Sequence, residues 1–324
     1  MLVNKTKDFN PKQYLEQIQL KIIRKIKNKT VLAAVSGGVD SAVSATIIKK
    51  AKIKNKLIFI DTGFLRKGET QEALKLFKSA GLKVNILKVD KIFYQKLKGK
   101  VGAREKREIF RQTYFKIIEN YAKNNNILYL VQGTQFHKNS VKIYHNCPPK
   151  DFKSLSVIEP VRGLKKDEIR LLGKYLKLPE KIVNRRPFPG PGLLIRFGGE
   201  YSRKKLELIK KATKIIEEFV DKNKKDFQEC YQIFPYLDDG AGVTYIDLKK
   251  KGGIGKILII RAVMQNYSNN KGLTYKIFSM SSLIQNKLVK KLMGNLDIAR
   301  VCFDLTPKYG SGNDIKPGAT IEYE

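Results

Sequence analysis

The sequence has few cysteines, few acidic residues and no long apolar run. Its three cysteines, Cys147, Cys230 and Cys302, lie far apart, which excludes a disulfide framework and the close pairs of a zinc site. No apolar stretch reaches the roughly 20 residues that a transmembrane helix needs, and residues 1–8 lack the apolar core of a signal peptide. We therefore expect a cytoplasmic protein with no membrane partner.

Acidic residues are scarce, since 30 Asp and Glu stand against 65 Lys and Arg, for a formal net charge of +35. One interpretation is a protein that binds nucleic acid. The other is a general lysine bias of the composition. The basic residues are spread from Lys5 to Lys316 without forming one basic arm. This spread favours the second interpretation, although a positive field would also suit phosphate-rich substrates.

The first half of the chain alternates predicted strands with predicted helices. The expected strands are 30–35, 56–61, 83–89 and 127–131; the expected helices are 11–27, 40–47, 70–80, 92–98 and 104–124. Such alternation predicts a parallel, doubly wound α/β sheet. Ligands of these sheets bind beyond the carboxyl ends of the strands, and Ser36, Phe64 and Gly133 fall at such ends.

The pattern changes at the proline- and glycine-rich segment 185–196. We place a domain boundary there, between 1–186 and 187–324. Apolar residues such as Phe188 and Leu193 indicate a packed junction in place of a loose linker. Beyond it the pattern predicts an α+β domain with helices 202–222 and 280–293 and strands 232–236, 243–248, 256–263, 299–305 and 320–323.

Residues 31–44 combine a short buried strand, the turn Ser36-Gly37-Gly38 and the start of a helix. Glycines let the backbone turn sharply and let a ligand approach it. A helix N-terminus offers free N–H groups and a partial positive charge, so it binds phosphate. The stretch therefore predicts a phosphate cradle. No lysine follows the glycines, which excludes the P-loop of common nucleotide hydrolases.

Ser-Gly-Gly-Val-Asp-Ser at 36–41 resembles the signature of the ATP pyrophosphatases, which include argininosuccinate, asparagine, NAD and GMP synthetases and tRNA-modifying enzymes. The resemblance implies that ATP and Mg²⁺ bind here and that Asp40 is both catalytic and a metal ligand. The implied ATP-binding residues are Ser36, Gly37, Gly38, Val39, Asp40, Ser41, Ala42, Phe64 and Gly133.

Further segments resemble GMP synthetase in particular. Arg186 to Arg196 is similar to that family's Arg-His-Pro-Phe-Pro-Gly-Pro-Gly-Leu-Ala-Ile-Arg, with Arg in place of His. Segments 59–69, 105–109, 158–170 and 316–324 resemble other family motifs in the same order. The resemblance implies that XMP, ATP and ammonia yield GMP through an adenyl-XMP intermediate. It places Arg107, Lys316, Ile321 and Glu322 at XMP, and the catalytic residues Lys142 and His145 in a lid.

The resemblance also implies partners. Many GMP synthetases carry an N-terminal glutaminase domain with a nucleophilic cysteine, whereas this chain begins at the helix before the phosphate strand. We therefore expect the synthetase subunit of the two-subunit, archaeal type, supplied with ammonia by a separate glutamine amidotransferase. The C-terminal domain is expected to form a homodimer.

Three departures from the family pattern leave an alternative open. The lid's Pro-Asp-x-x-Glu is absent, with His137 in place of the proline; the match near Thr244 is loose; and 309–315 is an insertion. The alternative is a diverged relative that does not aminate XMP and acts as a nucleotide- or RNA-binding protein. A tRNA-modifying enzyme is less favoured because no sulfur-carrying cysteine pair is present.

Overall fold

The computed structural model describes residues 9–134, 148–149, 152, 154–185, 188–238, 244–247, 250–268 and 272–306. The chain divides into two compact units. Unit 1 takes its described residues from 1–63, 68–93 and 110–190, and unit 2 takes them from 64–67, 94–109 and 191–324. Two short segments of the first half therefore belong to unit 2. The functional assignment of 1–186 and 187–324 stays a prediction.

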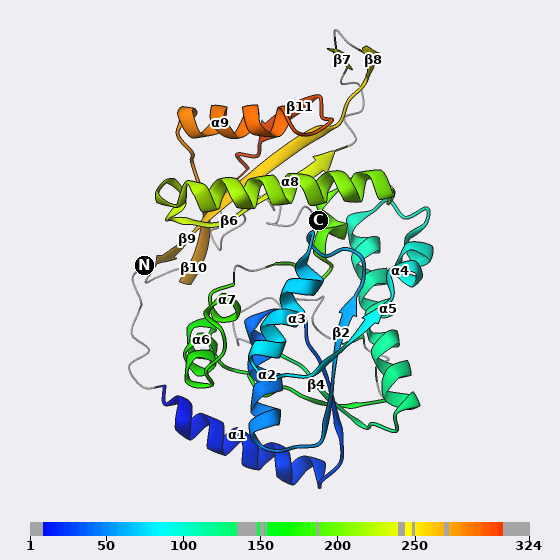
Figure 1. The fold of residues 1–324 in the computed structure, drawn as a ribbon, viewed down its shortest axis with the longest axis vertical. Coiled ribbons are helices and arrows are strands. Elements are labelled where there is room, and N and C mark those ends of the chain that lie inside the picture. Colours follow the sequence, from blue (N-terminus) through cyan, green and yellow to red (C-terminus); the bar gives the residue numbers. More distant parts are fainter. Residues whose placement is uncertain are drawn as a thin grey trace. The chain divides into compact units, whose positions relative to one another are not determined.

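Unit 1 is built on a parallel five-stranded sheet in the order β3-β2-β1-β4-β5 (Figure 1). The strands are β1 (Val31–Ala34), β2 (Asn55–Asp61), β3 (Val84–Lys88), β4 (Tyr129–Val131) and β5 (Ser156–Ile158). The chain starts at central β1, adds strands on one side and then crosses to the other through β4. This topology confirms the predicted doubly wound α/β sheet, whose switch point lies between β1 and β4.

Helices cover the sheet of unit 1 on both faces. They are α1 (Pro11–Ile26), α2 (Val39–Lys50), α3 (Glu69–Ser79), α6 (Lys166–Tyr175), α7 (Glu180–Val183) and, shared with unit 2, α4 (Asp90–Leu97) and α5 (Ala103–Asn124). Phe115 and Ile118 of α5 lie in one buried cluster with Leu32 and Leu130 of the strands. On α5, burial raises the pKa of Tyr114 to about 12. Helix α2 packs against α1, α6 and α7.

Unit 2 centres on the long strand β9 (Ile257–Ser268). Antiparallel β6 (Cys230–Asp238) and β10 (Gly272–Ile277) and parallel β11 (Arg300–Phe303) pair with it. Helix α8 (Arg203–Lys222) packs on β6 and contacts α9 (Ser282–Met293). The remaining elements are the 3-10 turns at Gly192–Arg196 and Lys224–Phe227 and the hairpin of β7 (Thr244–Asp247) and β8 (Lys250–Ile254).

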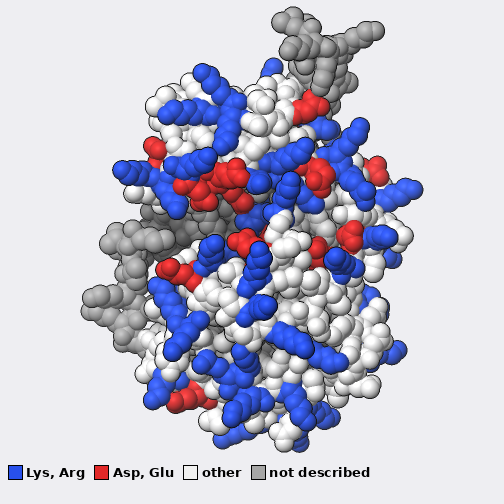
Figure 2. All heavy atoms as spheres, in the orientation of Figure 1, with Lys and Arg blue, Asp and Glu red and all other residues white. Residues whose placement is uncertain are grey.

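Most predicted elements form within a few residues of their expected bounds, while α6, α7, β5, β8 and β10 were not predicted and the expected strand 320–323 lies outside the described residues. Figure 2 shows Lys and Arg scattered over the visible face, without one dominant basic patch. In the part of the chain that the structure describes, no helix has both the length and the hydropathy to cross a membrane.

Candidate phosphate-binding site

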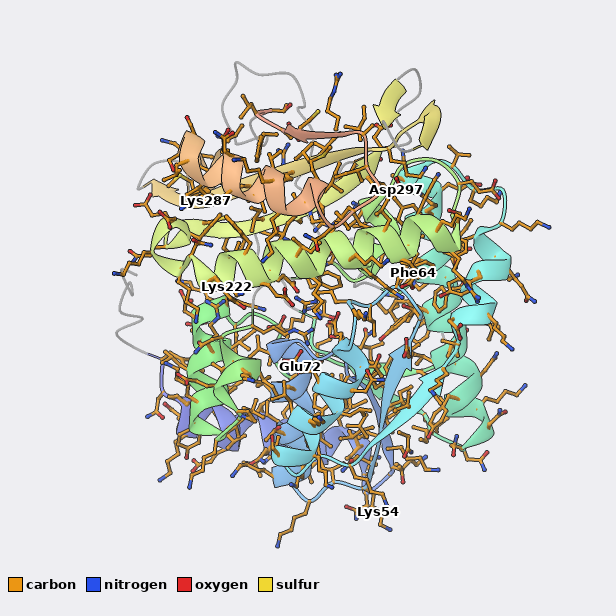
Figure 3. The ribbon with its side chains drawn as sticks, turned by 45° about the horizontal axis from the view of Figure 1, so that its top comes forward. Lys54, Phe64, Glu72, Lys222, Lys287 and Asp297 are labelled. Carbon is orange, nitrogen blue, oxygen red and sulfur yellow. The ribbon has the colours of Figure 1, made fainter. Side chains whose placement is uncertain are left out.

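The carboxyl edge of the unit 1 sheet carries the predicted phosphate cradle. In Figure 3, Lys54 before β2 and Glu72 in the first turn of α3 mark the two ends of this sheet, and the cradle lies at the Glu72 end. The turn after β1 has Gly37 at φ +80°, a left-handed conformation that favours glycine. The first intrahelical bond of α2 runs from Ala42 N–H to Gly38 O (3.1 Å). The N–H groups of residues 39–41 therefore have no intrahelical partner and can bind an anion.

Serine hydroxyls hold the cradle in shape. Ser41 Oγ accepts a hydrogen bond from Ser36 N–H at 3.1 Å and donates one to Gly38 O at 3.0 Å. Ser44 Oγ donates to Asp40 O at 2.9 Å. Ser41 is buried, whereas Ser36 is exposed. These bonds are made within the chain itself, so the turn is preorganised before a ligand arrives.

Gly133, just after β4, lies against the first turn of α2. A Cβ atom at this position would be 2.6 Å from Asp40 C and from Ser41 N. Any side chain would push the helix start away, so this close approach requires glycine. The structure thus brings Gly133 beside the cradle, as its predicted role at ATP requires.

Arg185 connects the cradle to helix α3. Its Nη1 donates a hydrogen bond to Gly37 O at 2.8 Å, and its Nη2 forms an ion pair with Glu69. Glu69 is only 4% exposed and begins α3, where a carboxylate is favoured by the helix dipole. We call these two contacts of Arg185, with Gly37 O and with Glu69, the clasp. The sequence did not predict it, because residues 37, 69 and 185 lie far apart along the chain.

Lys166 brings a cation to the cradle from α6. Its Nζ lies 2.8 Å from both Oδ1 and Oδ2 of Asp40. Because Asp40 is in the first turn of α2, the ammonium group lies beside the anion-binding helix end. Its charge is balanced by Asp40 in this structure, and the cation is in place for phosphates that bind at the turn. This pair was also missed from the sequence.

Asp61 ends β2 next to the cradle strand. Its Oδ1 accepts from Gly63 N–H at 3.0 Å and its Oδ2 accepts from Thr70 Oγ1 at 2.9 Å. Both oxygens are thus committed to holding the turn after β2. Asp61 is a structural residue in this arrangement.

One carboxylate of the site, that of Asp40, suits a metal ion that binds together with phosphate. Within the described residues, no three His, Cys, Asp or Glu side chains gather into a protein-only metal site. Mg²⁺ commonly binds through one or two carboxylates together with substrate phosphates. Asp40, at the phosphate-binding end of α2, is such a carboxylate; both of its oxygens lie 2.8 Å from Lys166 Nζ, so it would have to exchange this contact for the ion.

Two other predicted site residues lie in unit 2. Phe64 is fully buried, with its ring centroid 5.6 Å from that of Tyr94 and 5.8 Å from that of Tyr201. Its carbonyl oxygen accepts from Leu193 N–H at 2.8 Å. Arg107 lies in the N-terminal part of α5. Their contacts with ATP and XMP stay predictions.

Several predicted residues lie outside the described residues. They are His137, Lys142, His145, Lys316, Ile321, Glu322 and the insertion 309–315. The loosely matched region at Thr244 forms β7.

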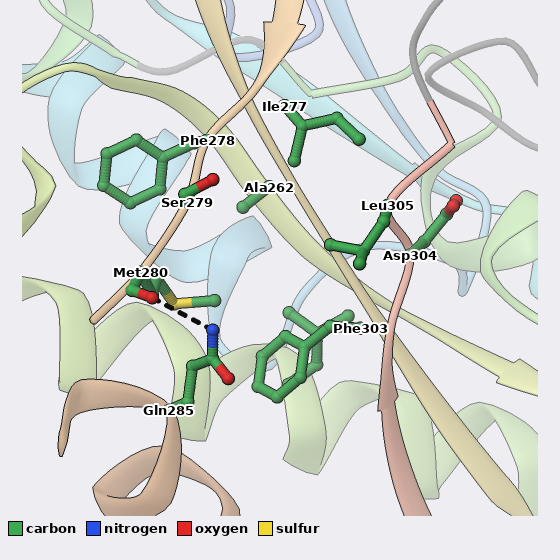
Figure 4. Close-up of a pocket in the computed structure, with 10 residues that line it drawn as sticks. Ala262, Ile277, Phe278, Ser279, Met280, Gln285, Phe303, Asp304 and Leu305 are labelled. Carbon is green, nitrogen blue, oxygen red and sulfur yellow. Dashed lines mark hydrogen bonds between the residues drawn. The ribbon is translucent and has the colours of Figure 1, made fainter. Parts of the chain in front are cut away.

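Unit 2 contains a small pocket of about 50 Å³ (Figure 4). It is lined by residues of β9, β10 and β11, such as Ile260, Ile277 and Phe303, and by the segments that follow β10 and β11. Gln285 Nε2 of α9 donates to Met280 O at 2.9 Å beside it. The pocket is far smaller than the several hundred Å³ that a nucleotide-sized ligand needs. It is a packing defect and not the candidate site.

A glycine turn that leads into a helix N-terminus, at the switch point of a doubly wound sheet and with its lysine supplied by another helix, defines an ATP pyrophosphatase. Comparisons with known proteins agree. The family model described as NAD synthase matches residues 12–228. One subunit of the glutamine-hydrolyzing GMP synthase of Archaeoglobus fulgidus is 33% identical over 96% of this chain and 99% of its own length.

The same subunit of Methanocaldococcus jannaschii is 34% identical over 98% of this chain and 100% of its own length. The glutamine-hydrolyzing GMP synthase of Chlorobium luteolum is 31% identical over 98% of this chain but only 61% of its own length. The chain therefore belongs to the GMP synthase family, which confirms the resemblance inferred from its motifs.

Proposed function

We propose that this chain makes GMP from XMP, ATP and ammonia, through an adenyl-XMP intermediate, with release of AMP and pyrophosphate. The observation that carries the proposal is an intact phosphate cradle in a chain that matches the archaeal GMP synthase subunits over almost its whole length. In this reaction the xanthine O2 attacks the α-phosphorus of ATP, and ammonia then displaces AMP from the adenylated base.

The cradle would hold the β- and γ-phosphates as the leaving pyrophosphate. The N–H groups at the start of α2 point toward the place where negative charge grows, and fixed donors of this kind stabilise the transition state. Lys166 adds a positive charge at the same helix end. Asp40 would hold Mg²⁺, which neutralises phosphate charge when bound.

The acceptor nucleotide would be held by residues from other segments. Arg107 and Lys316 are cations suited to the XMP phosphate, Glu322 can accept from the base, and Ile321 adjoins it. Lys142 and His145 would close over the reacting groups as part of the lid. These assignments rest on the family motifs that contain the residues.

Ammonia would come from a separate glutamine amidotransferase subunit. The archaeal relatives are each named as one subunit of a glutamine-hydrolyzing enzyme, which implies such a partner. The longer Chlorobium relative is consistent with a second domain in one chain, since this chain matches only 61% of it. We further propose that residues 187–324 form a homodimer.

An assay with purified chain, XMP, ATP and free ammonium tests the proposal. We expect GMP, AMP and pyrophosphate in equal amounts. Pyrophosphate without GMP, or no XMP-dependent turnover, would contradict it. The diverged alternative predicts instead that RNA binds tightly at low salt and weakly at high salt.

A further inference from the structure

Gln132 lies at the switch point of the unit 1 sheet and has no role in the site described above. It follows β4, the strand beside the cradle strand β1. Its backbone N–H donates to Ile158 O at 2.9 Å, so strand pairing continues through it. Ligands of doubly wound sheets bind where the strand order reverses. Gln132 is therefore placed at the edge where ligands are expected.

The side-chain amide of Gln132 is buried without a partner for its oxygen. The residue is 8% exposed, and among the described residues Oε1 has no hydrogen-bond partner. Buried polar atoms are almost always paired, because leaving one unpaired costs stability. An unpaired acceptor at a ligand-binding edge is complementary to a ligand that donates an N–H or O–H group.

The strand geometry separates Gln132 from the phosphates. Side chains alternate between the two faces of a strand. Gly133 packs against the first turn of α2 on one face, whereas Leu130 lies in the cluster with α5 on the other. The same alternation, continued one residue past the end of β4, assigns Gln132 to the α5 face. The group that it binds is thus across the sheet edge from the pyrophosphate cradle.

The structure assigns Gln132 as a positioning residue for the purine that is adenylated. We infer that its Oε1 accepts a hydrogen bond from the ring N–H beside the attacking O2 of XMP. Phosphate oxygens are acceptors and cannot satisfy an amide oxygen, and xanthine has an N–H next to O2. This inference rests on the proposed function and names one residue that orients its acceptor substrate.

The test uses two variants of Gln132 in the full chain. Gln132→Met keeps the size but removes the acceptor, and Gln132→Glu keeps an acceptor oxygen. We expect the Met variant to raise KM for XMP about tenfold, with unchanged KM for ATP and ammonium. The Met variant should also have a Tm roughly 3 °C higher, because the unpaired buried oxygen is gone. The Glu variant should recover XMP affinity.

Gln19→Met is the matched control. Gln19 in α1 donates from Nε2 to Ile47 O at 3.2 Å and takes no part in the site. Its replacement should lower Tm slightly and leave every KM unchanged.

The possible outcomes are distinct. If the Met variant lowers Tm and raises all three KM values together, Gln132 is structural and the inference is wrong; it is also wrong if only KM for ATP rises. If the Met variant does not fold, Gln132→Leu, which also lacks the acceptor, takes its place beside the Glu variant. A rise in KM for XMP with Leu but not with Glu supports the inference, and the same KM for XMP in both variants contradicts it. Failure of the wild-type chain to make GMP would contradict the proposed function itself, before any variant is made.

Discussion

Two loops in this protein use the backbone in opposite ways. The cradle of unit 1, where the turn 36–38 leads into α2, presents the N–H groups of residues 39–41 and leaves them for a ligand. In unit 2, loop 197–200 presents carbonyl acceptors, and two buried lysines take all of them. Lys106 Nζ donates to Phe197 O and Gly199 O, both at 3.0 Å, and Lys205 Nζ donates to Gly198 O at 3.1 Å and Glu200 O at 3.0 Å.

The difference separates a binding loop from a structural one. Lys106 is 1% exposed, and its burial is tolerated because the carbonyl dipoles and the Phe197 ring, 4.9 Å away, stabilise its charge. In the second loop every acceptor is satisfied within the chain, so no ligand is needed. In the cradle, charge is brought nearby by Lys166 while the N–H donors stay available.

The largest effect is expected from Gly133→Ala. The added Cβ would lie 2.6 Å from the backbone of Asp40 and Ser41, so the start of α2 must move. We expect kcat/KM for ATP to fall about 100-fold, because misplacing a catalytic group by about 1 Å can cost that much. Gly102→Ala is the control, since its Cβ would meet only Glu105 Cβ at 3.8 Å. Equal activity of the two variants would show that the cradle tolerates displacement.

Lys106→Met should destabilise loop 197–200 of unit 2 without changing the cradle of unit 1. The buried carbonyl of Phe197 and the half-buried carbonyl of Gly199 would lose their donor, and we expect the free energy of unfolding in urea to fall by about 2 kcal/mol. The exposed Lys204→Met should change it by less than about 0.5 kcal/mol. Similar stabilities of the two variants would mean that water replaces the ammonium group.

Lys166→Ala tests whether the cradle needs its neighbouring cation. We expect KM for ATP to rise about tenfold at low salt, with a smaller difference at high salt because ions screen the charge. Lys166→Arg should keep most of the affinity. Lys174→Ala, in the last turn of the same helix, is the control. A rise in KM as large for Lys174→Ala would mean that only the overall charge matters.

Arg185→Lys should have the smallest effect. The guanidinium contacts Gly37 O and Glu69 at once, whereas a single ammonium group does not reproduce this fork. We expect KM for ATP to rise about threefold, since the serine hydrogen bonds still hold the turn. The rate of pyrophosphate release at varied ATP concentration measures this KM. Arg162→Lys is the control, because Arg162 forms an exposed ion pair. If Arg185→Lys lowered kcat/KM for ATP as much as Gly133→Ala, the clasp would be the main support of the cradle, and the close approach of Gly133 to α2 would not.

Sequence reasoning predicted what local chemistry dictates. The strand, glycine turn and helix start at 31–44 are encoded by neighbouring residues, and alternation of strands and helices indicated the doubly wound sheet. It missed the helices α6 and α7. It also missed β5, β8 and β10 because these strands are short or contain glycine and polar residues. Their pairing comes from neighbours distant in sequence, which local propensity cannot reveal.

The amino-acid sequence alone was enough to predict the α/β class, the phosphate cradle and the family. Only the tertiary structure showed that Lys166, Arg185 and Glu69 gather around the cradle. It also placed Phe64 among aromatic side chains of unit 2 and left Gln132 Oε1 buried without a partner among the described residues. The physical reason is that a turn is set by its own residues, whereas a side chain's partners depend on how distant segments pack.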